Sequence, residues 1–295
     1  MGRIFDPTQF RRPWMFNYAQ NPNILLLDDR LRVFFTCRPE RDSAGNCVSL
    51  TAFVDLEKSE PFKIIGLSDQ PVLELGNPGD FDEFGIMPGS IVPIDDNVIY
   101  LYYVGWTRMY SVPYEWSNGL AISTDSGKSF RKYSKGPIMG ATFDDPYLQA
   151  CPRVHKVSPN EFVMWYNSDT ACLFDGTNWS IYNPIVLPTI VEKECQTSSS
   201  FISFNGQNHL FFSFRHGIDF RNQNKGYRIG YAVGEGFENW ARVDHLSDLS
   251  VSRSGWDSEM VCYPHVVEID KQIYMFYCGN NFGQQGFGVA RLDNV

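Results

Sequence analysis

The sequence repeats one short pattern five times, in which an apolar strand, a polar turn and an aromatic-rich strand follow one another. Each turn contains Asp, Asn, Gly or Pro, which tolerate tight hairpin geometry. The flanking runs are rich in Val, Ile, Phe and Tyr, which favour a half-buried sheet. The segments are NILLLDDRLRVFFTCR from Asn23, SIVPIDDNVIYLYYVG from Ser90, RVHKVSPNEFVMWYNS from Arg153, SFISFNGQNHLFFSFR from Ser200 and HVVEIDKQIYMFYCGN from His265.

This spacing indicates the class of fold. Copies about 45 to 65 residues apart, each with three or four strands, are typical of β-propeller blades. We expect an all-β protein, a five-bladed β-propeller of mostly three- to four-stranded antiparallel blades. We expect a single domain over residues 1–295, with blades at about 20–66, 85–138, 148–190, 196–247 and 258–293. A β-sandwich whose hairpins look alike is the alternative.

Composition narrows the function. The net charge of −9 argues against a general binder of nucleic acid or of anionic membranes. No secretory signal and no apolar run of roughly 18 residues is recognisable. The seven cysteines are scattered and form no zinc pattern, which favours a reducing, cytoplasmic location. We expect no cofactor, no metal and no nucleic-acid partner, and the sequence gives no oligomeric state.

Carboxylates precede the first strand in four of the five copies. In a propeller this strand lines the central channel, so residues just before it are expected to gather around the axis. Paired carboxylates there suit sugar chemistry, one giving a proton and another activating water or stabilising the oxocarbenium ion. The alternative is that turns simply favour Asp and Glu. The catalytic candidates are Asp82, Asp145, Glu194 and Asp257, with Glu83 beside the first.

Arginines gather after the second strand of two copies. Consecutive antiparallel strands exchange ends, so these residues are expected on the same face as the carboxylates. The planar guanidinium group binds carboxylate or phosphate through two parallel hydrogen bonds, although some arginines here could instead pair with nearby acids. The substrate-binding candidates, Glu83 among them, are otherwise Arg38, Arg41, Asp42, Gln196, Arg215, His216, Arg221, Arg228, Tyr263, His265, Asn280 and Asn281.

The stretches FTCRPERD, FDEFGIMP, ECQ, FRHGIDFRNQNKGYRIGYA, WDSEMVCYPHV and GNNFGQQGFGVA together resemble the five-bladed propeller glycosidases. That group holds arabinanases, xylosidases, fructosidases and levansucrases (glycoside hydrolase families 43, 32, 68 and 130). The chain is more closely similar to glycosidase-like bacterial propellers of surface-polysaccharide gene clusters. The resemblance covers nearly the whole chain.

The resemblance implies roles for particular residues. Glu194, in the Glu-Cys dipeptide, matches the acid/base of the fructosidase branch, and Asp82 falls near the acid that stabilises the transition state. The remaining aspartate, just before the first inner strand, is replaced by Gln20 and Asn21. An amide cannot act as base or nucleophile; Asp6 and Asp42 are possible substitutes. Related propellers sometimes hold an axial calcium ion, for which His216 and His265 are the candidate neighbours.

Three functions stay open. The first is a glycoside hydrolase that uses carboxylate acid/base chemistry in the central pocket. The second is a glycosyltransferase or phosphorylase, in which arginines hold a phosphate or a nucleotide-sugar leaving group. The third is a non-catalytic propeller that binds sugars. The expected partner is accordingly a carbohydrate or a nucleotide sugar.

Overall fold

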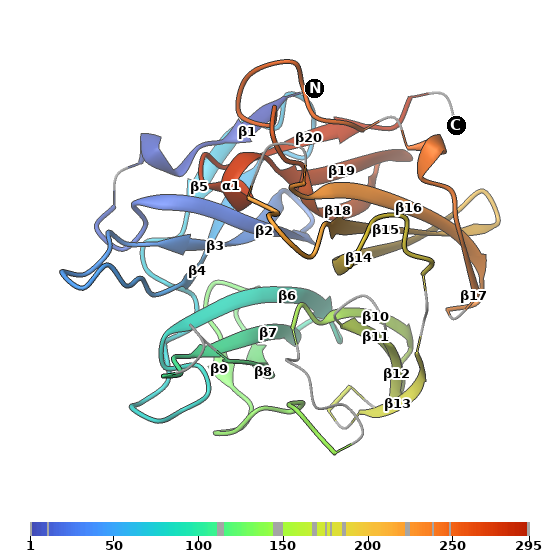
Figure 1. Ribbon diagram of the computed structural model, residues 1–295. Coiled ribbons are helices and arrows are strands. Elements are labelled where there is room, and N and C mark those ends of the chain that lie inside the picture. Colours follow the sequence, from blue (N-terminus) through green and yellow to red (C-terminus); the bar gives the residue numbers. More distant parts are fainter. Residues whose placement is uncertain are drawn as a thin grey trace.

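A computed structural model describes the chain over residues 2–10, 12–110, 115–143, 150–166, 170–174, 176–177, 179–184, 187–221, 225–237, 239–247 and 249–293. The fold is an all-β propeller with antiparallel sheets (Figure 1), which agrees with the predicted class. The described residues form five four-stranded sheets.

Four sheets are built from strands that follow one another along the chain. The first sheet contains β2 (Asn17–Leu26), β3 (Leu31–Arg38), β4 (Leu50–Leu56) and β5 (Ile64–Leu67). The second contains β6 (Gly85–Pro93), β7 (Ile99–Thr107), β8 (Glu115–Ser123) and β9 (Arg131–Lys132). The third contains β10 (Arg153–Ser158), β11 (Glu161–Tyr166), β12 (Thr170–Phe174) and β13 (Ser180–Pro184). The fourth contains β14 (Cys195–Phe204), β15 (Gln207–Arg215), β16 (Arg228–Glu235) and β17 (Asn239–Arg242).

The fifth sheet joins the two ends of the chain. Its order is β1 (Arg3–Phe5), β20 (Phe287–Arg291), β19 (Gln272–Cys278) and β18 (Cys262–Ile269). The N-terminal strand therefore supplies the outermost strand of a sheet otherwise made by the C-terminal residues. The short helical elements are η1 (Pro7–Gln9), η2 (Asp244–Leu246) and α1 (Asn280–Gly283).

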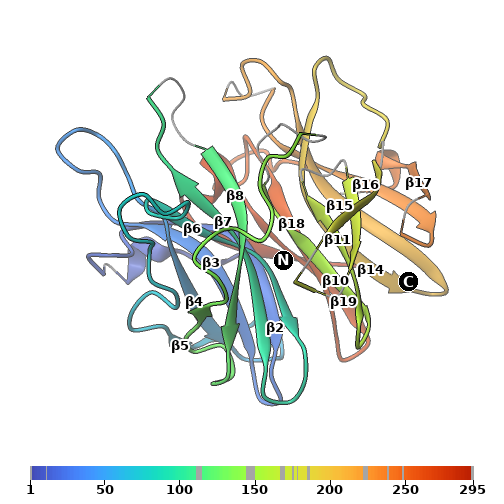
Figure 2. The same ribbon diagram turned by 90° about the horizontal axis from the view of Figure 1, so that it is seen from below.

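The first strand of each sheet lies at the centre of the molecule. β2 contacts β6, β6 contacts β10, β10 contacts β14, β14 contacts β18, and β18 returns to β2. Seen side on, the longer loops gather at one end of the sheets and tight hairpin turns at the other (Figure 2). The loops that precede first strands and the loops that follow second strands lie at the same end, the one with the longer loops.

Backbone irregularities mark the central strands. Asn21, Ser198 and Tyr263 all have positive φ angles, between 53° and 59°, inside β2, β14 and β18. The pairing with the second strand shifts at each of these places. Such bulges are common beside active sites because they redirect side chains.

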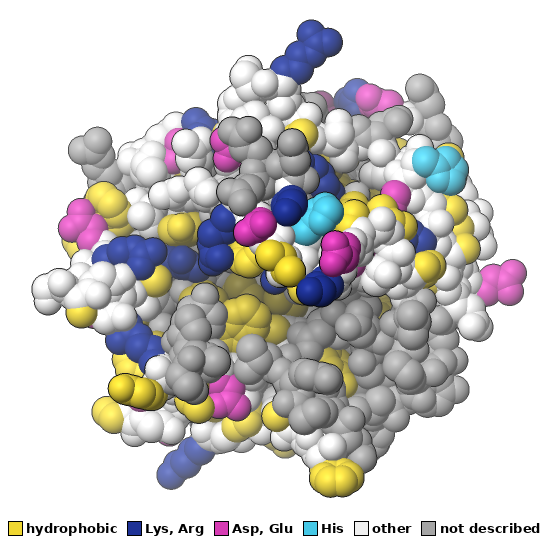
Figure 3. Space-filling model, in the orientation of Figure 1, with side chains coloured by type: hydrophobic (Ala, Val, Ile, Leu, Met, Phe, Trp, Pro, Cys, Tyr) yellow, Lys and Arg dark blue, Asp and Glu magenta, His cyan; other side chains and the backbone are white. Residues whose placement is uncertain are grey.

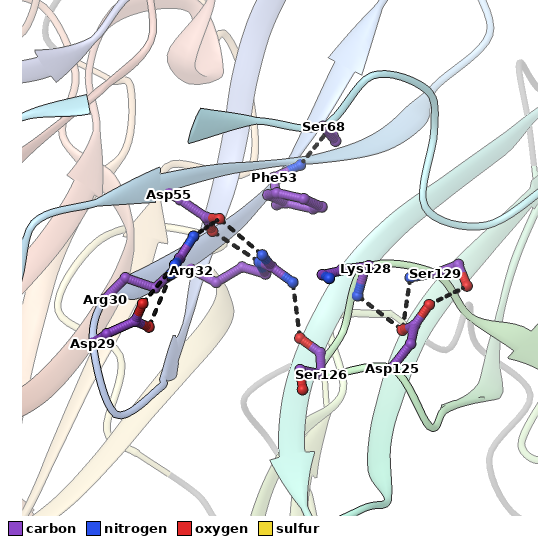
Figure 4. A network of polar contacts seen from close by, with 10 residues as sticks. All are labelled: Asp29, Arg30, Arg32, Phe53, Asp55, Ser68, Asp125, Ser126, Lys128 and Ser129. Atoms are coloured by element: carbon purple, nitrogen blue, oxygen red, sulfur yellow. Dashed lines mark hydrogen bonds and ion pairs between the residues drawn. The ribbon is translucent and has the colours of Figure 1, made fainter. Parts of the chain in front are cut away.

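Apolar packing and a buried ion pair hold neighbouring sheets together. Phe5 of β1 packs against Phe35 of β3, with ring centroids 4.9 Å apart, and aromatic pairs contribute about 0.5–1.5 kcal/mol beyond their burial. Arg32 makes two 2.8 Å hydrogen bonds to Asp55 and one to the carbonyl of Ser126 in the second sheet (Figure 4). Arg32 and Asp55 are both buried, and their hydrogen-bonded pairing balances the charge of each inside the protein.

Candidate functional site

The face with the longer loops is hollowed near its centre (Figure 3). Lys and Arg side chains lie around this hollow together with Asp, Glu and His side chains, and hydrophobic side chains show within it. Arg38 and Arg215 end the second strands β3 and β15, and these strand ends belong to this face.

Arg38 ends β3 and is held by aromatic and amide groups. Its guanidinium carbon lies 4.3 Å from the ring centroid of Tyr18 and 5.4 Å from that of Trp106. Nη2 donates a 3.2 Å hydrogen bond to the side-chain oxygen of Gln20. Nε is buried and makes no hydrogen bond to the described residues. The described residues thus orient this side chain and leave donor capacity unused.

Arg215 ends β15 in a similar setting. Its guanidinium carbon lies 3.9 Å from the ring centroid of Phe220, and Nε donates a 3.1 Å hydrogen bond to the hydroxyl of Tyr227. Nη1 donates to the carbonyl oxygen of His216. Within the described ranges, neither Arg38 nor Arg215 forms an ion pair with a carboxylate.

A chain of contacts connects the two arginines. The Gln20 amide accepts from Arg38 and donates a 3.2 Å hydrogen bond to the hydroxyl of Tyr263. The Tyr263 ring packs against the ring of Tyr227, with centroids 5.7 Å apart, and Tyr227 accepts from Arg215. We call these residues (Gln20, Arg38, Arg215, Tyr227 and Tyr263) the arginine–tyrosine cluster. The predicted arginines of the first and fourth sheets are thereby brought together, along with Tyr263.

Burial affects the tyrosines of this cluster. It raises the pKa of Tyr227 to about 12, against the opposing effect of Arg215, and it raises the pKa of Tyr263 well above its usual value. Both phenols therefore stay protonated at neutral pH and act as hydrogen-bonding groups. The cluster therefore combines two guanidinium groups that pack on aromatic rings with an amide and two phenol groups between them. This combination suits a polar ligand that carries negative charge.

Asp82 and Asp257 are directed back onto their own sheets. Asp82 is buried, accepts a 2.8 Å hydrogen bond from Tyr103 of β7 and lies 2.7 Å from the ammonium group of Lys132 on the outer strand β9. Asp257 is also buried and accepts a 2.9 Å hydrogen bond from Tyr277 of β19. Both carboxylates fasten the segment before a first strand to the second strand of that sheet. Their catalytic roles stay predictions.

Glu194 has a comparable position in the fourth sheet. Its Oε1 lies 2.6 Å from Arg242, at the end of the outer strand β17, and the side chains of the pair are 0% and 4% exposed. Oε2 accepts from the backbone amides of Ile190 and Val191, and Oε1 also accepts from Gln196. The carboxylate is enclosed by four donors, so acid/base catalysis would require it to leave this setting. That role too stays a prediction.

Several other predicted residues stabilise loops. Asp42 accepts from the backbone amides of Ala44 and Asn46 within an exposed turn, and these hydrogen bonds, above all those of Asn46, lower its pKa. Asn280 accepts from two backbone amides of the loop before β18. The remaining contacts are to backbone groups: Arg41 to Gly45, Arg228 to Glu259, Glu83 to Gly79 and Gln196 to Leu187.

The remaining predicted residues lie beside the cluster, elsewhere in the fold, or outside the residues that the structure describes. The Arg221 guanidinium lies 4.4 Å from the ring centroid of Phe220, which also supports Arg215. His216 gives its carbonyl to Arg215, and Asn281 has a positive φ of 52° within α1. Asp145 lies outside the described residues. His265 of β18 lines a small cavity together with Arg153 of β10.

Sequence reasoning included Tyr263 but missed two other aromatic residues at this site. Tyr18 and Tyr227 support the two arginines, and neither was singled out. Gln20 appeared as the replacement of a carboxylate rather than as the bridge between Arg38 and Tyr263. The available signal was position, because Tyr227 lies inside the quoted stretch FRHGIDFRNQNKGYRIGYA and Tyr18 lies two residues before Gln20.

Within the described ranges, no group of three or more His, Cys, Asp or Glu side chains is arranged to hold a metal ion. None of the helices described here has the length and apolar character needed to cross a membrane.

Comparison with known sequences finds relatives along the whole chain but no family. No protein-family profile matches the sequence. The chain is 28% identical over 313 residues to "Uncharacterized protein Rv1502" of Mycobacterium tuberculosis strain H37Rv, an alignment that covers 100% of this chain and 98% of that protein. A second strain, CDC 1551, has "Uncharacterized protein MT1551", with the same identity and coverage.

Several solved structures with the same fold have titles that name glycoside hydrolases. One, titled "The GH130 family of mannoside phosphorylases contains glycoside hydrolases that target beta-1,2 mannosidic linkages in Candida mannan", has a TM-score of 0.74 and 16% identity, covering 98% of this chain and 91% of that one. A glycosyl hydrolase from Bacteroides ovatus has a TM-score of 0.72 and 16% identity, covering 99% and 88%. A thermostable family-43 glycoside hydrolase has a TM-score of 0.68 and 14% identity, covering 96% and 93%.

Proposed function

We propose that the protein is a carbohydrate-active enzyme that makes or breaks a glycosidic bond in the central hollow, with a phosphate group of its substrate held at the arginine–tyrosine cluster. Either free phosphate, in phosphorolysis, or the phosphate of a nucleotide-sugar donor meets this description. We further propose that the five sheets are the blades of one five-bladed ring, on the support of the contacts between successive first strands.

One observation carries the proposal. In the described part of the chain, Arg38 and Arg215 are oriented by aromatic rings and neutral acceptors and have no carboxylate partner. An arginine with a mainly structural role, such as Arg32, has such a partner in Asp55. A charged leaving group or attacking phosphate needs positive charge where negative charge develops, and two supported guanidinium groups supply it.

Hydrolysis by paired carboxylates is the second candidate. The titles of the structural neighbours favour it, since they name glycoside hydrolases. Its weakness is that Asp82, Glu194 and Asp257 are each engaged within a sheet. A sugar-binding propeller without catalysis is the third candidate.

Turnover assays separate these functions. The protein is incubated with glycans with and without inorganic phosphate, and with nucleotide sugars plus acceptor glycans. Phosphate-dependent formation of a sugar 1-phosphate, or release of a nucleotide, supports the proposal. Release of reducing sugar at equal rates with and without phosphate supports hydrolysis, and binding without turnover supports the third candidate.

Two variants test the arginines. We expect Arg38→Met and Arg215→Met each to raise the dissociation constant for the phosphate-bearing substrate by about 10- to 100-fold, because a hydrogen bond to a charged group contributes about 1.5–3 kcal/mol. Arg131→Met is the matched control, since Arg131 is exposed on the outer strand β9. Equal affinity in all three variants would contradict the proposal.

A further inference from the structure

Arg153, the first residue of β10, is a buried cation inside the ring. It is 4% exposed. Nη1 donates to the side-chain oxygen of Asn23 at 2.7 Å and to the carbonyl of Gly89 at 2.9 Å, and Nη2 donates to the side-chain oxygen of Asn21 at 2.5 Å. All three acceptors are neutral. Nε is buried and makes no hydrogen bond to the described residues.

No described carboxylate balances this charge. The contrast with Arg32 is direct, because that arginine is equally buried but is bidentate to Asp55 (Figure 4). Nor does the nearby thiol of Cys278 supply an anion, since burial raises its pKa to about 12. A buried charge without a partner of opposite charge is costly. The described groups around Arg153 therefore leave its positive charge unbalanced.

A small cavity lies beside Arg153, among the first strands of four sheets. Its volume is about 80 Å³, and its polar lining includes Ser90, Arg153, Ser200 and His265 from four different sheets. A site for one water molecule needs about 10–15 Å³, so this cavity has room for a small ion and accompanying waters.

The lining presents hydrogen-bond donors to this cavity. The hydroxyl oxygen of Ser90 accepts the backbone amide of Val154, and that of Ser200 accepts the amide of Val266, each at 2.8 Å. Because each oxygen is already an acceptor, each hydroxyl has its proton to donate. Burial, and then the charge of Arg153, lowers the pKa of His265 to about 3; the neutral ring carries one N–H donor at neutral pH.

We propose that a small monovalent inorganic anion, with chloride as the representative, binds in this cavity beside Arg153. It would balance the guanidinium charge and accept hydrogen bonds from the serine hydroxyls and from His265. A cation is disfavoured in the same place by Arg153. The site does not depend on the proposed catalytic function, because none of the residues that line the cavity belongs to the arginine–tyrosine cluster.

The expected effect is on the closure of the ring. Arg153 connects the third sheet with Asn21 and Asn23 of the first and with Gly89 of the second, and His265 belongs to the fifth. An anion among these groups would stabilise their association. Because a ligand of the native state stabilises it in proportion to the logarithm of its concentration, the melting temperature becomes anion-dependent.

The test is thermal unfolding in sodium chloride against sodium isethionate at equal ionic strength, since isethionate is too large for the cavity. We expect chloride to raise the melting temperature by about 3 °C or more. Crystals soaked in bromide are expected to show an anomalous peak beside Arg153. Equal melting temperatures in the two salts, or no bromide in the cavity, would overturn the proposal.

Variants assign the effect to this site. Arg153→Gln is expected to abolish the difference between chloride and isethionate, whereas the exposed control Arg131→Gln keeps it. If Arg153→Gln does not fold, Asn21→Asp is the deciding variant, because it places a fixed negative charge against Nη2 of Arg153. We expect Asn21→Asp to fold and to be insensitive to chloride. A chloride effect of unchanged size in Asn21→Asp would contradict the assignment.

Discussion

Replacement of Glu194 by glutamine tests whether this residue acts mainly on stability. The substitution keeps the shape of the side chain and removes its charge. In the native structure, the side chains of Glu194 and Arg242 are 0% and 4% exposed, with oxygen and nitrogen 2.6 Å apart. Breaking a buried pair from one side costs about 3–5 kcal/mol. Arg242 retains Asp244 at 2.8 Å, so we expect the lower end of this range, about 3 kcal/mol.

The assay is urea unfolding followed by tryptophan fluorescence, with Glu192→Gln as the matched control. Glu192 is exposed and two residues away; it should change the free energy of unfolding by less than about 0.5 kcal/mol. Turnover is measured in parallel at a temperature where both variants are folded. A Glu194→Gln protein as stable as the Glu192→Gln control, but inactive, would refute the structural interpretation and favour general acid/base catalysis by Glu194.

Three further substitutions test other contacts. Tyr277→Phe should lower the free energy of unfolding by about 2–3 kcal/mol, because Asp257 loses the described hydrogen-bond donor to its Oδ2. Tyr103→Phe should cost only about 1 kcal/mol, because Asp82 keeps its contact with Lys132. Equal costs of the two substitutions in urea unfolding would contradict this. His265 has a pKa lowered from 6.5 to about 3 in the folded state, so the unfolded chain binds more protons between these values and stability falls as the pH falls, by about 1.4 kcal/mol per pH unit at most. Unfolding in chloride-free buffer should therefore depend less on pH in His265→Gln than in the native protein, and parallel pH profiles would exclude this cause. Arg32→Met leaves Asp55 with the 3.3 Å contact to Arg30 and should cost about 3–5 kcal/mol in calorimetry; a cost below 1 kcal/mol would show that the buried pair contributes little.

The propeller could be predicted from sequence because its evidence is local. Each hairpin carries its own alternation of apolar residues and its own turn, and β2–β3 and β18–β19 pair as neighbouring segments should. The pairing of β1 with β20 was not predicted, since Arg3 and Gly288 are partners across almost the whole chain. Three residues of a short N-terminal strand give no periodic pattern from which such closure could be inferred.

The candidate site was predicted only in part, for a different physical reason. A carboxylate before a first strand can face the axis or turn back over its sheet, and the sequence does not distinguish these directions. The partners that hold Asp82 and Asp257 are Tyr103 and Tyr277 on the second strands, and their place is set by strand register. Arg153 illustrates the same limit, because its burial depends on Asn21 and Gly89 from two other sheets.

The central claim is that the arginine–tyrosine cluster holds the phosphate of a sugar substrate. A crystal structure of the protein grown with a sugar 1-phosphate or a nucleotide sugar tests it most directly. We expect phosphate oxygens within about 3 Å of guanidinium nitrogens of Arg38 or Arg215, with the sugar in the central hollow. Phosphate bound away from both arginines, with the sugar against Asp82, Glu194 or Asp257 instead, would contradict it.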